Sequence, residues 1–206
     1  MSKSYYIIIS FLFFSSCIHV ADNSTEVTEK ECNDIIFETD SVIEEIIPVT
    51  IELSSIERVA LIYTAEIGVK ELTGKNDGVR VEEYLAAANR KKGDAWCAAF
   101  VTWVLKEAGI VAVISGWSPD WFPVKNTIYT RGAKTNQTPN KADVLGIYYS
   151  EFKRIAHVGF IDEWGIGNFC MTVEGNTNDT GDREGHGVYK KRRLKSQIYK
   201  VSRWVI

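Results

Sequence analysis

Cys97 and His157 are the two side chains whose types and positions could together carry out nucleophilic catalysis. Cys97 lies in the stretch Asp94-Ala95-Trp96-Cys97-Ala98, directly before a predicted helix. The amides and the macrodipole at a helix N-terminus favour negative charge, so they stabilise a thiolate and lower the pKa of a cysteine there. A buried, unreactive cysteine at a helix start would show the same local pattern. This context alone therefore does not decide between the two interpretations.

His157 opens a predicted strand over 157–164, as a polar residue at the end of an otherwise apolar segment. Two other histidines are present: His19 falls in a segment predicted to be unstructured, and His186 falls in a loop rich in Gly, Asp and Glu. If Cys97 has an imidazole base, His157 is therefore the leading candidate.

A third polar group is expected beside His157 because of the reversal Gly165-Ile166-Gly167-Asn168, which separates two predicted strands. Pairing outward from this turn sets His157 opposite roughly Glu174 to Asn176. Side chains directly opposite each other in antiparallel strands lie about 5 Å apart. A carboxylate or an amide at this position could hold the imidazole through its second nitrogen.

Helices are expected first and strands last along the folded part of the chain. Ser54-Ser55-Ile56-Glu57 has the form of a capping box and starts an apolar stripe at helical spacing that continues to Leu72 and stops at Gly74. Two further helices are predicted over 81–89 and 98–108. Strands are predicted over 144–149, 157–164, 169–174, 188–194 and 198–205. This order predicts an α+β fold, with N-terminal helices packed on a C-terminal antiparallel sheet of about five strands.

Three short stretches resemble the CHAP family of cysteine- and histidine-dependent amidohydrolases and peptidases, which is related to the NlpC-type cell-wall peptidases. These stretches are Trp96-Cys97-Ala98-Ala99-Phe100-Val101, Ala156-His157-Val158-Gly159 and Val173-Glu174-Gly175-Asn176. The resemblance extends from about Ile56 to the C-terminus. It implies a papain-like fold and hydrolysis of an amide bond in peptidoglycan, either within a stem peptide or cross-bridge or between sugar and peptide.

The resemblance also implies a role for each site residue. Cys97 would be the nucleophile, and His157 the general base and then the acid. Glu174 would be the orienting partner and Asn176 a further polar member, although these two could exchange roles. The thiolate would attack the amide carbonyl, the imidazolium would protonate the leaving amine, and water would hydrolyse the thioester. Many family members have Gln where this chain has Trp96, which leaves the oxyanion donors open, with the Cys97 backbone N–H as the best candidate.

Neither a cofactor nor a metal is expected. Some CHAP members carry an Asp-x-Asp calcium loop ahead of the cysteine, whereas only Asp94 lies close here. Asn76-Asp77-Gly78 lacks the further spaced oxygens that calcium needs, so it is predicted to be a turn.

Aromatic side chains are candidates for substrate binding because their faces suit both sugars and peptides. The candidate substrate-binding residues are Trp96, Trp117, Trp121 and, at the rim of the site, Asn178. Packing of the aromatic loop on the domain is the alternative. The basic run Lys190-Lys191-Arg192-Arg193 is predicted to be a solvated strand rather than a site for anionic wall polymer.

The segment 1–17 is predicted to be an export signal with a lipidation site. Lys3 precedes an apolar run over 5–14, which ends in Phe14-Ser15-Ser16-Cys17 and resembles a lipobox. An ordinary signal peptide with an incidental cysteine is the alternative. The acidic segment 18–53 is predicted to be a disordered tether, and 54–206 the catalytic domain. We therefore expect an exported protein of the cell envelope, lipid-anchored through Cys17 in the periplasm or outer membrane.

Composition limits the remaining possibilities. A chain of 206 residues, 45% of them hydrophobic, suits one compact domain plus additional chain. A net charge of −3 gives no basic footprint for nucleic acid. Of the four cysteines, Cys32 falls in the tether and Cys170 in a strand, so no disulfide framework is predicted. We expect a monomer acting on peptidoglycan. The alternatives are a catalytically silent wall-binding module, or a papain-like acyltransferase or protease for another substrate.

Overall fold

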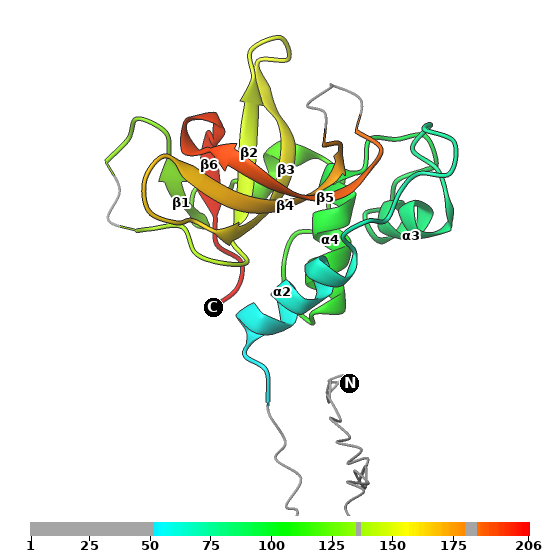
Figure 1. The fold of residues 1–206 in the computed structure, drawn as a ribbon, viewed down its shortest axis with the longest axis horizontal. Coiled ribbons are helices and arrows are strands. Elements are labelled where there is room, and N and C mark those ends of the chain that lie inside the picture. Colours follow the sequence, from blue (N-terminus) through cyan, green and yellow to red (C-terminus); the bar gives the residue numbers. More distant parts are fainter. Residues whose placement is uncertain (1–51, 135–136, 180–184) are drawn as a thin grey trace, which may run out of the picture. The chain divides into compact units, whose positions relative to one another are not determined.

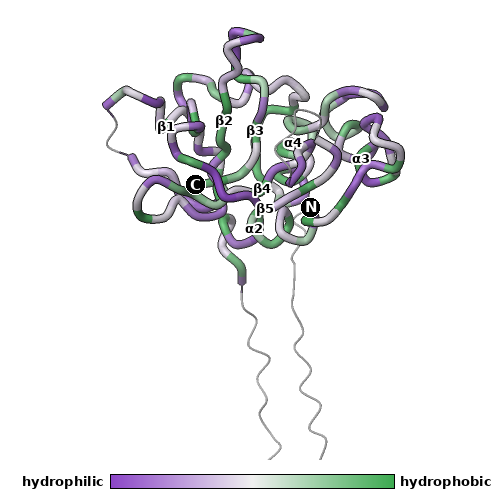
Figure 2. The backbone as a smooth tube through the Cα atoms, turned by 45° about the horizontal axis from the view of Figure 1, so that its top comes forward, coloured by the Kyte–Doolittle hydropathy of each residue, from purple (hydrophilic) through white to green (hydrophobic). Residues whose placement is uncertain are grey.

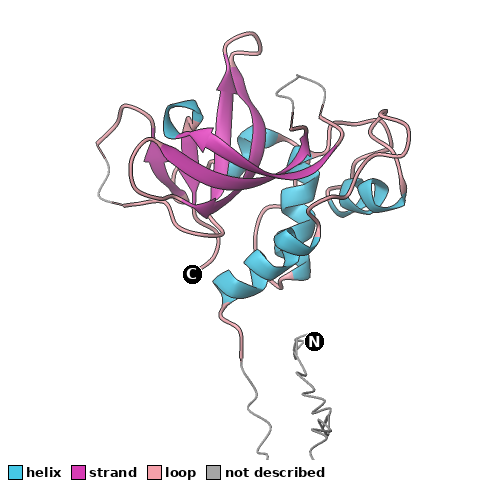
Figure 3. Cartoon of the chain, in the orientation of Figure 1, coloured by secondary structure: helices cyan, strands magenta, loops and turns pink. Residues whose placement is uncertain are grey.

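Three helices precede a six-stranded sheet in the computed structural model, which describes residues 52–134, 137–179 and 185–206 (Figures 1 and 3). The helices are α2 (Ser55–Ala65), α3 (Val79–Ala87) and α4 (Cys97–Glu107). The strands are β1 (Thr127–Thr130), β2 (Val144–Tyr149), β3 (Arg154–Glu163), β4 (Phe169–Thr177), β5 (Gly187–Leu194) and β6 (Lys200–Ser202). Short 3₁₀ helices, η1 (Ser118–Trp121) and η2 (Lys195–Gln197), precede β1 and β6. The predicted α+β fold is confirmed.

The strands pair in the order β1-β6-β2-β3-β4-β5, and all of these pairings are antiparallel. β2 has its predicted bounds, whereas β6 is shorter than the predicted strand over 198–205. β1 is a sixth strand beyond the five predicted. It is only four residues long and pairs with β6 at the edge of the sheet, so its sequence shows too little alternation to predict a strand.

α2 begins with the predicted capping box. The Ser54 hydroxyl accepts a hydrogen bond from the backbone N–H of Glu57 at 3.2 Å, and the Glu57 carboxylate accepts one from the backbone N–H of Ser54 at 2.9 Å. Two of the amides that a helix start leaves unpaired are satisfied in this way. The predicted start of α2 is therefore confirmed.

α2 ends at Ala65 instead of continuing toward Gly74, which corrects the predicted length of this helix. Gly68 adopts a φ of +98°, in the left-handed region that favours glycine, and its N–H donates to the carbonyl of Val188 at 3.0 Å. The helix does not continue through Gly68, because hydrogen bonds to β5 replace those of a further helical turn.

α4 packs against β3 and β4, and the buried core lies between the helices and this face of the sheet (Figure 1). Phe100 of α4 meets Phe160 of β3 edge-on, with ring centroids 6.2 Å apart. Gly175 of β4 permits this close approach, because a Cβ there would lie 2.8 Å from the Phe100 Cβ and 2.7 Å from the Trp96 ring. The first turn of α4 is thus held directly on the sheet.

A second, smaller core involves other side chains of the sheet. Its buried members are Ile128, Leu145, Ile147, Ile161, Cys170, Ile198 and Val201. Figure 2 shows the hydrophobic stretches along β2 and β3 and the hydrophilic stretch of β5. Buried apolar side chains on both sides of the central strands fix the register of β3, the strand that carries His157.

The predicted signal segment with Cys17, and nearly all of the predicted tether with Cys32, lie outside the described residues. Within the described ranges, no helix combines the length and the apolar character needed to cross a lipid bilayer. Cys97 and Cys170 are both buried free thiols.

Candidate active site

Cys97 is the first residue of α4 and is almost fully buried, with 6% of its surface exposed. The preceding residue, Trp96, supplies no side-chain cap to the helix. The partial positive charge of the first amides of α4 is therefore left to act on the thiol. The hydroxyl of Ser118, at the start of η1, lies 3.6 Å from the Cys97 Sγ. This position favours a thiolate.

His157 lies on β3 next to an irregularity in the pairing with β2. Ile147 pairs with His157, but the next residue, Tyr148, pairs with Ile155, so one residue of β3 is extra. Such bulges re-aim side chains along a strand. The Nε2 atom of His157 lies 2.7 Å from the Oε2 atom of Glu174. Nδ1 is the nitrogen left to face Cys97, whose thiol interacts with this imidazole.

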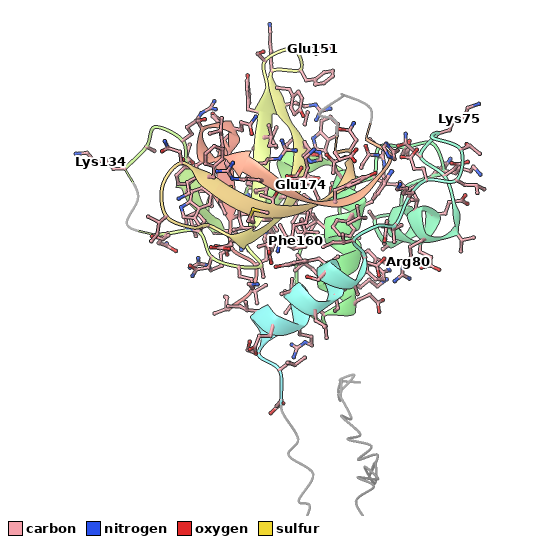
Figure 4. The ribbon with its side chains drawn as sticks, in the orientation of Figure 1. Lys75, Arg80, Lys134, Glu151, Phe160 and Glu174 are labelled. Atoms are coloured by element: carbon pink, nitrogen blue, oxygen red, sulfur yellow. The ribbon has the colours of Figure 1, made fainter. Side chains whose placement is uncertain are left out.

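Glu174 is completely buried and lies on β4, the strand between β3 and the edge strand β5 (Figure 4). Its Oε2 atom contacts His157, and its Oε1 atom accepts a hydrogen bond from the Thr172 hydroxyl at 2.6 Å. The guanidinium of Arg193 on β5 donates to both carboxylate oxygens. Both oxygens of the carboxylate are therefore hydrogen-bonded to protein groups.

The electrostatics of the site favour an ion pair between thiolate and imidazolium. Burial raises the pKa of Cys97, but the hydrogen bond and charge of His157, together with the Ser118 hydroxyl, outweigh burial and hold this pKa below its ordinary value. Burial opposes protonation of His157 as well, yet Cys97 and Glu174 raise its pKa from 6.5 to about 9. Burial disfavours the charged carboxylate of Glu174, but Arg193 and His157 hold its pKa well below the usual range.

Asn176 lies beside Trp96 rather than beside His157. In the orientation that satisfies its neighbours, its amide oxygen accepts from the Trp96 backbone N–H at 3.2 Å and from the indole N–H at 2.9 Å. The amide of Asn76 lies 2.8 Å away. Of the two predicted orienting residues, Glu174 is the one against the imidazole, and Asn176 instead fixes the residue that precedes Cys97.

Three of the four predicted substrate-binding residues are buried. Trp96 and Trp121 have 0% of their surface exposed, and Asn178 has 2%. Trp96 stacks on Tyr84 with ring centroids 5.6 Å apart, and Trp121 packs edge-on against Trp204 at 5.4 Å. The prediction that these three side chains contact substrate is therefore not supported, because burial leaves no ring face or amide for a ligand. Trp96 and Trp121 instead fit the alternative interpretation, in which the aromatic side chains pack within the domain.

Trp117 is the fourth of these residues, and 48% of its surface is exposed. It directly precedes Ser118, whose hydroxyl faces the thiol. The guanidinium of Arg154 lies 4.0 Å from the centroid of the Trp117 ring and 5.4 Å from that of Phe152. Trp117 therefore offers an exposed aromatic ring, with a positive charge over it, directly before Ser118 in the sequence.

Arg193 is the charged site residue that the sequence interpretation missed. It belongs to the basic run expected to be solvated, and within that run Lys190 and Arg192 are exposed whereas Lys191 and Arg193 are half-buried. The alternation of a strand predicts that only every second residue of such a run faces solvent. Ser118 and Thr172 carried no comparable signal, because their contacts with the site are tertiary.

The Asp77 carboxylate forms hydrogen bonds within a turn. Its carboxylate accepts from the Thr73 backbone N–H at 2.9 Å and from the Thr73 hydroxyl at 2.8 Å. In the part of the chain that the structure describes, no group of three His, Cys, Asp or Glu side chains converges as metal ligands would.

A crystal structure of an NlpC/P60 family protein from Bacillus cereus is similar to this chain, with a TM-score of 0.43 and 13% sequence identity. The similarity covers 73% of this chain and 40% of the other, so this chain spans less than half the length of that protein. No protein-family model and no curated protein sequence matches the chain. At this level the similarity establishes neither family nor activity, and membership of the CHAP family stays a prediction.

Proposed function

We propose that this chain is an exported cysteine amidohydrolase of papain-like fold that cleaves an amide bond in peptidoglycan. The observation that carries the proposal is the row formed by Cys97, His157 and Glu174. A buried thiol at a helix N-terminus shares an imidazole whose other nitrogen lies 2.7 Å from a carboxylate. A nucleophile beside a base that a third group orients is the arrangement of covalent acyl transfer. The choice of peptidoglycan rests on the resemblance to the CHAP family.

In the proposed mechanism the Cys97 thiolate attacks the carbonyl carbon of the amide. The backbone N–H of Cys97, one of the first amides of α4, has no acceptor within the helix and donates to the developing oxyanion. The carbon–nitrogen bond breaks as the Nδ1–H of His157 protonates the departing amine, which leaves a thioester on Cys97. Neutral His157 then takes a proton from water, the hydroxide attacks the thioester, and the acid departs with the thiolate restored.

The bond cleaved lies within a stem peptide or cross-bridge, or joins sugar to peptide. Trp117 is the aromatic residue best placed to contact either, since it is exposed and directly precedes Ser118, whose hydroxyl lies beside the thiol. Ring faces pack favourably on both sugars and peptide groups.

The decisive experiment incubates the full chain with purified sacculi under reducing conditions and identifies the released fragments by mass spectrometry. Cys97→Ala is expected to lower the rate of release by at least about 10³-fold, because the nucleophile is lost. Cys170→Ala is the matched control, since Cys170 is also a buried free thiol but is not among the residues that contact Cys97. This control should release fragments at the rate of the unchanged chain.

Release of the same fragments by Cys97→Ala, or none by the unchanged chain, would contradict the proposal. Binding to sacculi without cleavage would indicate a silent wall-binding module. Products in which an amine has been joined would indicate an acyltransferase, and cleavage confined to protein substrates would indicate a protease.

A further inference from the structure

Arg193 is tied to the candidate active site through Glu174. Its Nε donates to Oε1 of the carboxylate and its Nη2 to Oε2, so the guanidinium binds as a two-pronged fork. Oε2 is also the atom that contacts His157. Because Glu174 is completely buried, Arg193, Thr172 and His157 take the place of water around it.

The row includes Arg193 as its fourth member, after Cys97, His157 and Glu174. The charges of these four side chains alternate when the site is in its reactive state. The Cys97 thiolate and the Glu174 carboxylate are negative, whereas the His157 imidazolium and the Arg193 guanidinium are positive. These four charges cancel. Without the guanidinium the buried row would carry a net negative charge, and a buried site relieves such a charge by binding a proton.

We propose that Arg193 is a positioning residue for the nucleophile. It holds the Glu174 carboxylate, and through it the imidazole, in a buried row whose charges cancel, so that Cys97 is a thiolate near neutral pH. The inference rests on the proposed function only in taking Cys97 as the nucleophile.

No other basic residue of β5 occupies this place. The Nζ of Lys190 lies 2.7 Å from the carboxylate of Asp162. Lys191 turns its Nζ to the Thr177 hydroxyl at 3.4 Å and to the carbonyl of Asn178. Arg192 is exposed and lies over the Phe169 ring, 3.5 Å from its centroid. Besides its four members, the titratable and charged groups that surround the row are Tyr149 of β2, Cys170 of β4, Lys191 of β5, Lys195 of η2, and Asp179.

The test is the pH dependence of Cys97 alkylation by iodoacetamide in the full chain, followed by mass spectrometry of the peptide that contains Cys97. Only the thiolate reacts, so the rate reports the fraction of thiolate at each pH. Arg193→Gln keeps a hydrogen-bonding side chain but removes the charge. It should move the midpoint of the rate profile upward by about one pH unit, an almost tenfold loss of thiolate below the midpoint.

Arg192→Gln is the matched control and should keep the midpoint of the unchanged chain, because Arg192 does not contact the row. The proposal is overturned if folded Arg193→Gln keeps that midpoint or if Arg192→Gln moves it equally. Circular dichroism establishes folding. If Arg193→Gln does not fold, Arg193→Met decides, since it also removes the charge but leaves a long, adaptable side chain to pack in the same place. An upward shift in Arg193→Met supports the proposal, and an unchanged midpoint overturns it.

Alkylation requires no substrate, so this test is separate from that of the proposed function. A shifted midpoint in a chain that does not cleave sacculi would keep the role of Arg193 and reject the peptidoglycan activity. Cleavage together with an unshifted midpoint would reject the role of Arg193 alone.

Discussion

His157 sets the upper pH limit of the proposed activity, because its imidazole is held between a thiol and a carboxylate. Its pKa is raised to about 9, so the imidazolium that would protonate the leaving amine in the proposed mechanism is present below this pH and is lost as pH rises through it. Its contribution to the free energy of unfolding has the same sign. That contribution is complete below 6.5 and disappears as pH rises through about 9.

Glu174→Gln should move this alkaline limit to lower pH. Removal of the negative charge beside the imidazole lowers the pKa of His157, by about one unit or more for a partner in direct contact. The measurement is an NMR titration of the His157 ring, which can be assigned because the chain has three histidines. The control is Glu163→Gln, which changes an exposed carboxylate on β3, the strand that carries His157. It should leave the His157 titration unchanged. An unaltered His157 titration in Glu174→Gln would contradict the electrostatics described above.

At the residue scale, the proximity of the candidate site residues was predictable from the sequence where it depended on residue type and strand pairing. The thiol, the imidazole and the carboxylate could be assigned because a turn aligns β3 with β4 and a helix start follows Trp96. Burial was not predictable for Trp96 and Trp121, because it depends on which distant rings pack on them. Arg193 was hidden by its three basic neighbours, which share its charge but not its hydrogen bonds to Glu174.

Among the elements, the contact of α4 with β4 decides whether the thiol meets the imidazole. Gly175→Ala would bring a methyl group within 2.8 Å of Phe100 and push the helix start from the sheet. We expect a loss of about 1–3 kcal/mol in the free energy of unfolding, measured by urea denaturation, because overpacking strains a dense core. Alkylation of Cys97 should also slow, since the thiol moves relative to His157.

Asn168→Ala is the control for this change, because Asn168 is exposed in the turn that begins the same strand. Its unfolding midpoint and its alkylation rate should match those of the unchanged chain. If Gly175→Ala also matches the unchanged chain in both measurements, the close approach of α4 to β4 does not matter for the site.

The extent of each element could be predicted only where local chemistry marks its end. The capping box located the start of α2 because Ser54 and Glu57 satisfy amides within their own turn. Its end was missed because the apolar spacing continues past Gly68, where hydrogen bonds to β5 take over. The position of β6 between β1 and β2 was likewise unpredictable, since it depends on pairing between strands distant in sequence.

For the whole molecule, the proposed location in the cell envelope depends on Cys17. If Cys17 carries lipid, Cys17→Ser should transfer the protein from the membrane fraction to the soluble fraction, because acyl chains supply the attachment. Cell fractionation with immunoblotting measures the distribution, and Cys32→Ser, in the acidic segment that follows the signal, is the matched control. Membrane association that survives Cys17→Ser would contradict lipidation at this residue.

The proposed role of Arg193 also bears on how the protein is made. The nucleophile, the base, the carboxylate and the guanidinium follow one another along the chain, from α4 through β3 and β4 to β5. A nascent chain that has emerged only as far as β4 carries the thiol and its partners, but not the charge that completes the row. For a protein that crosses a membrane unfolded, full nucleophilicity would then arise only once β5 has docked on the far side.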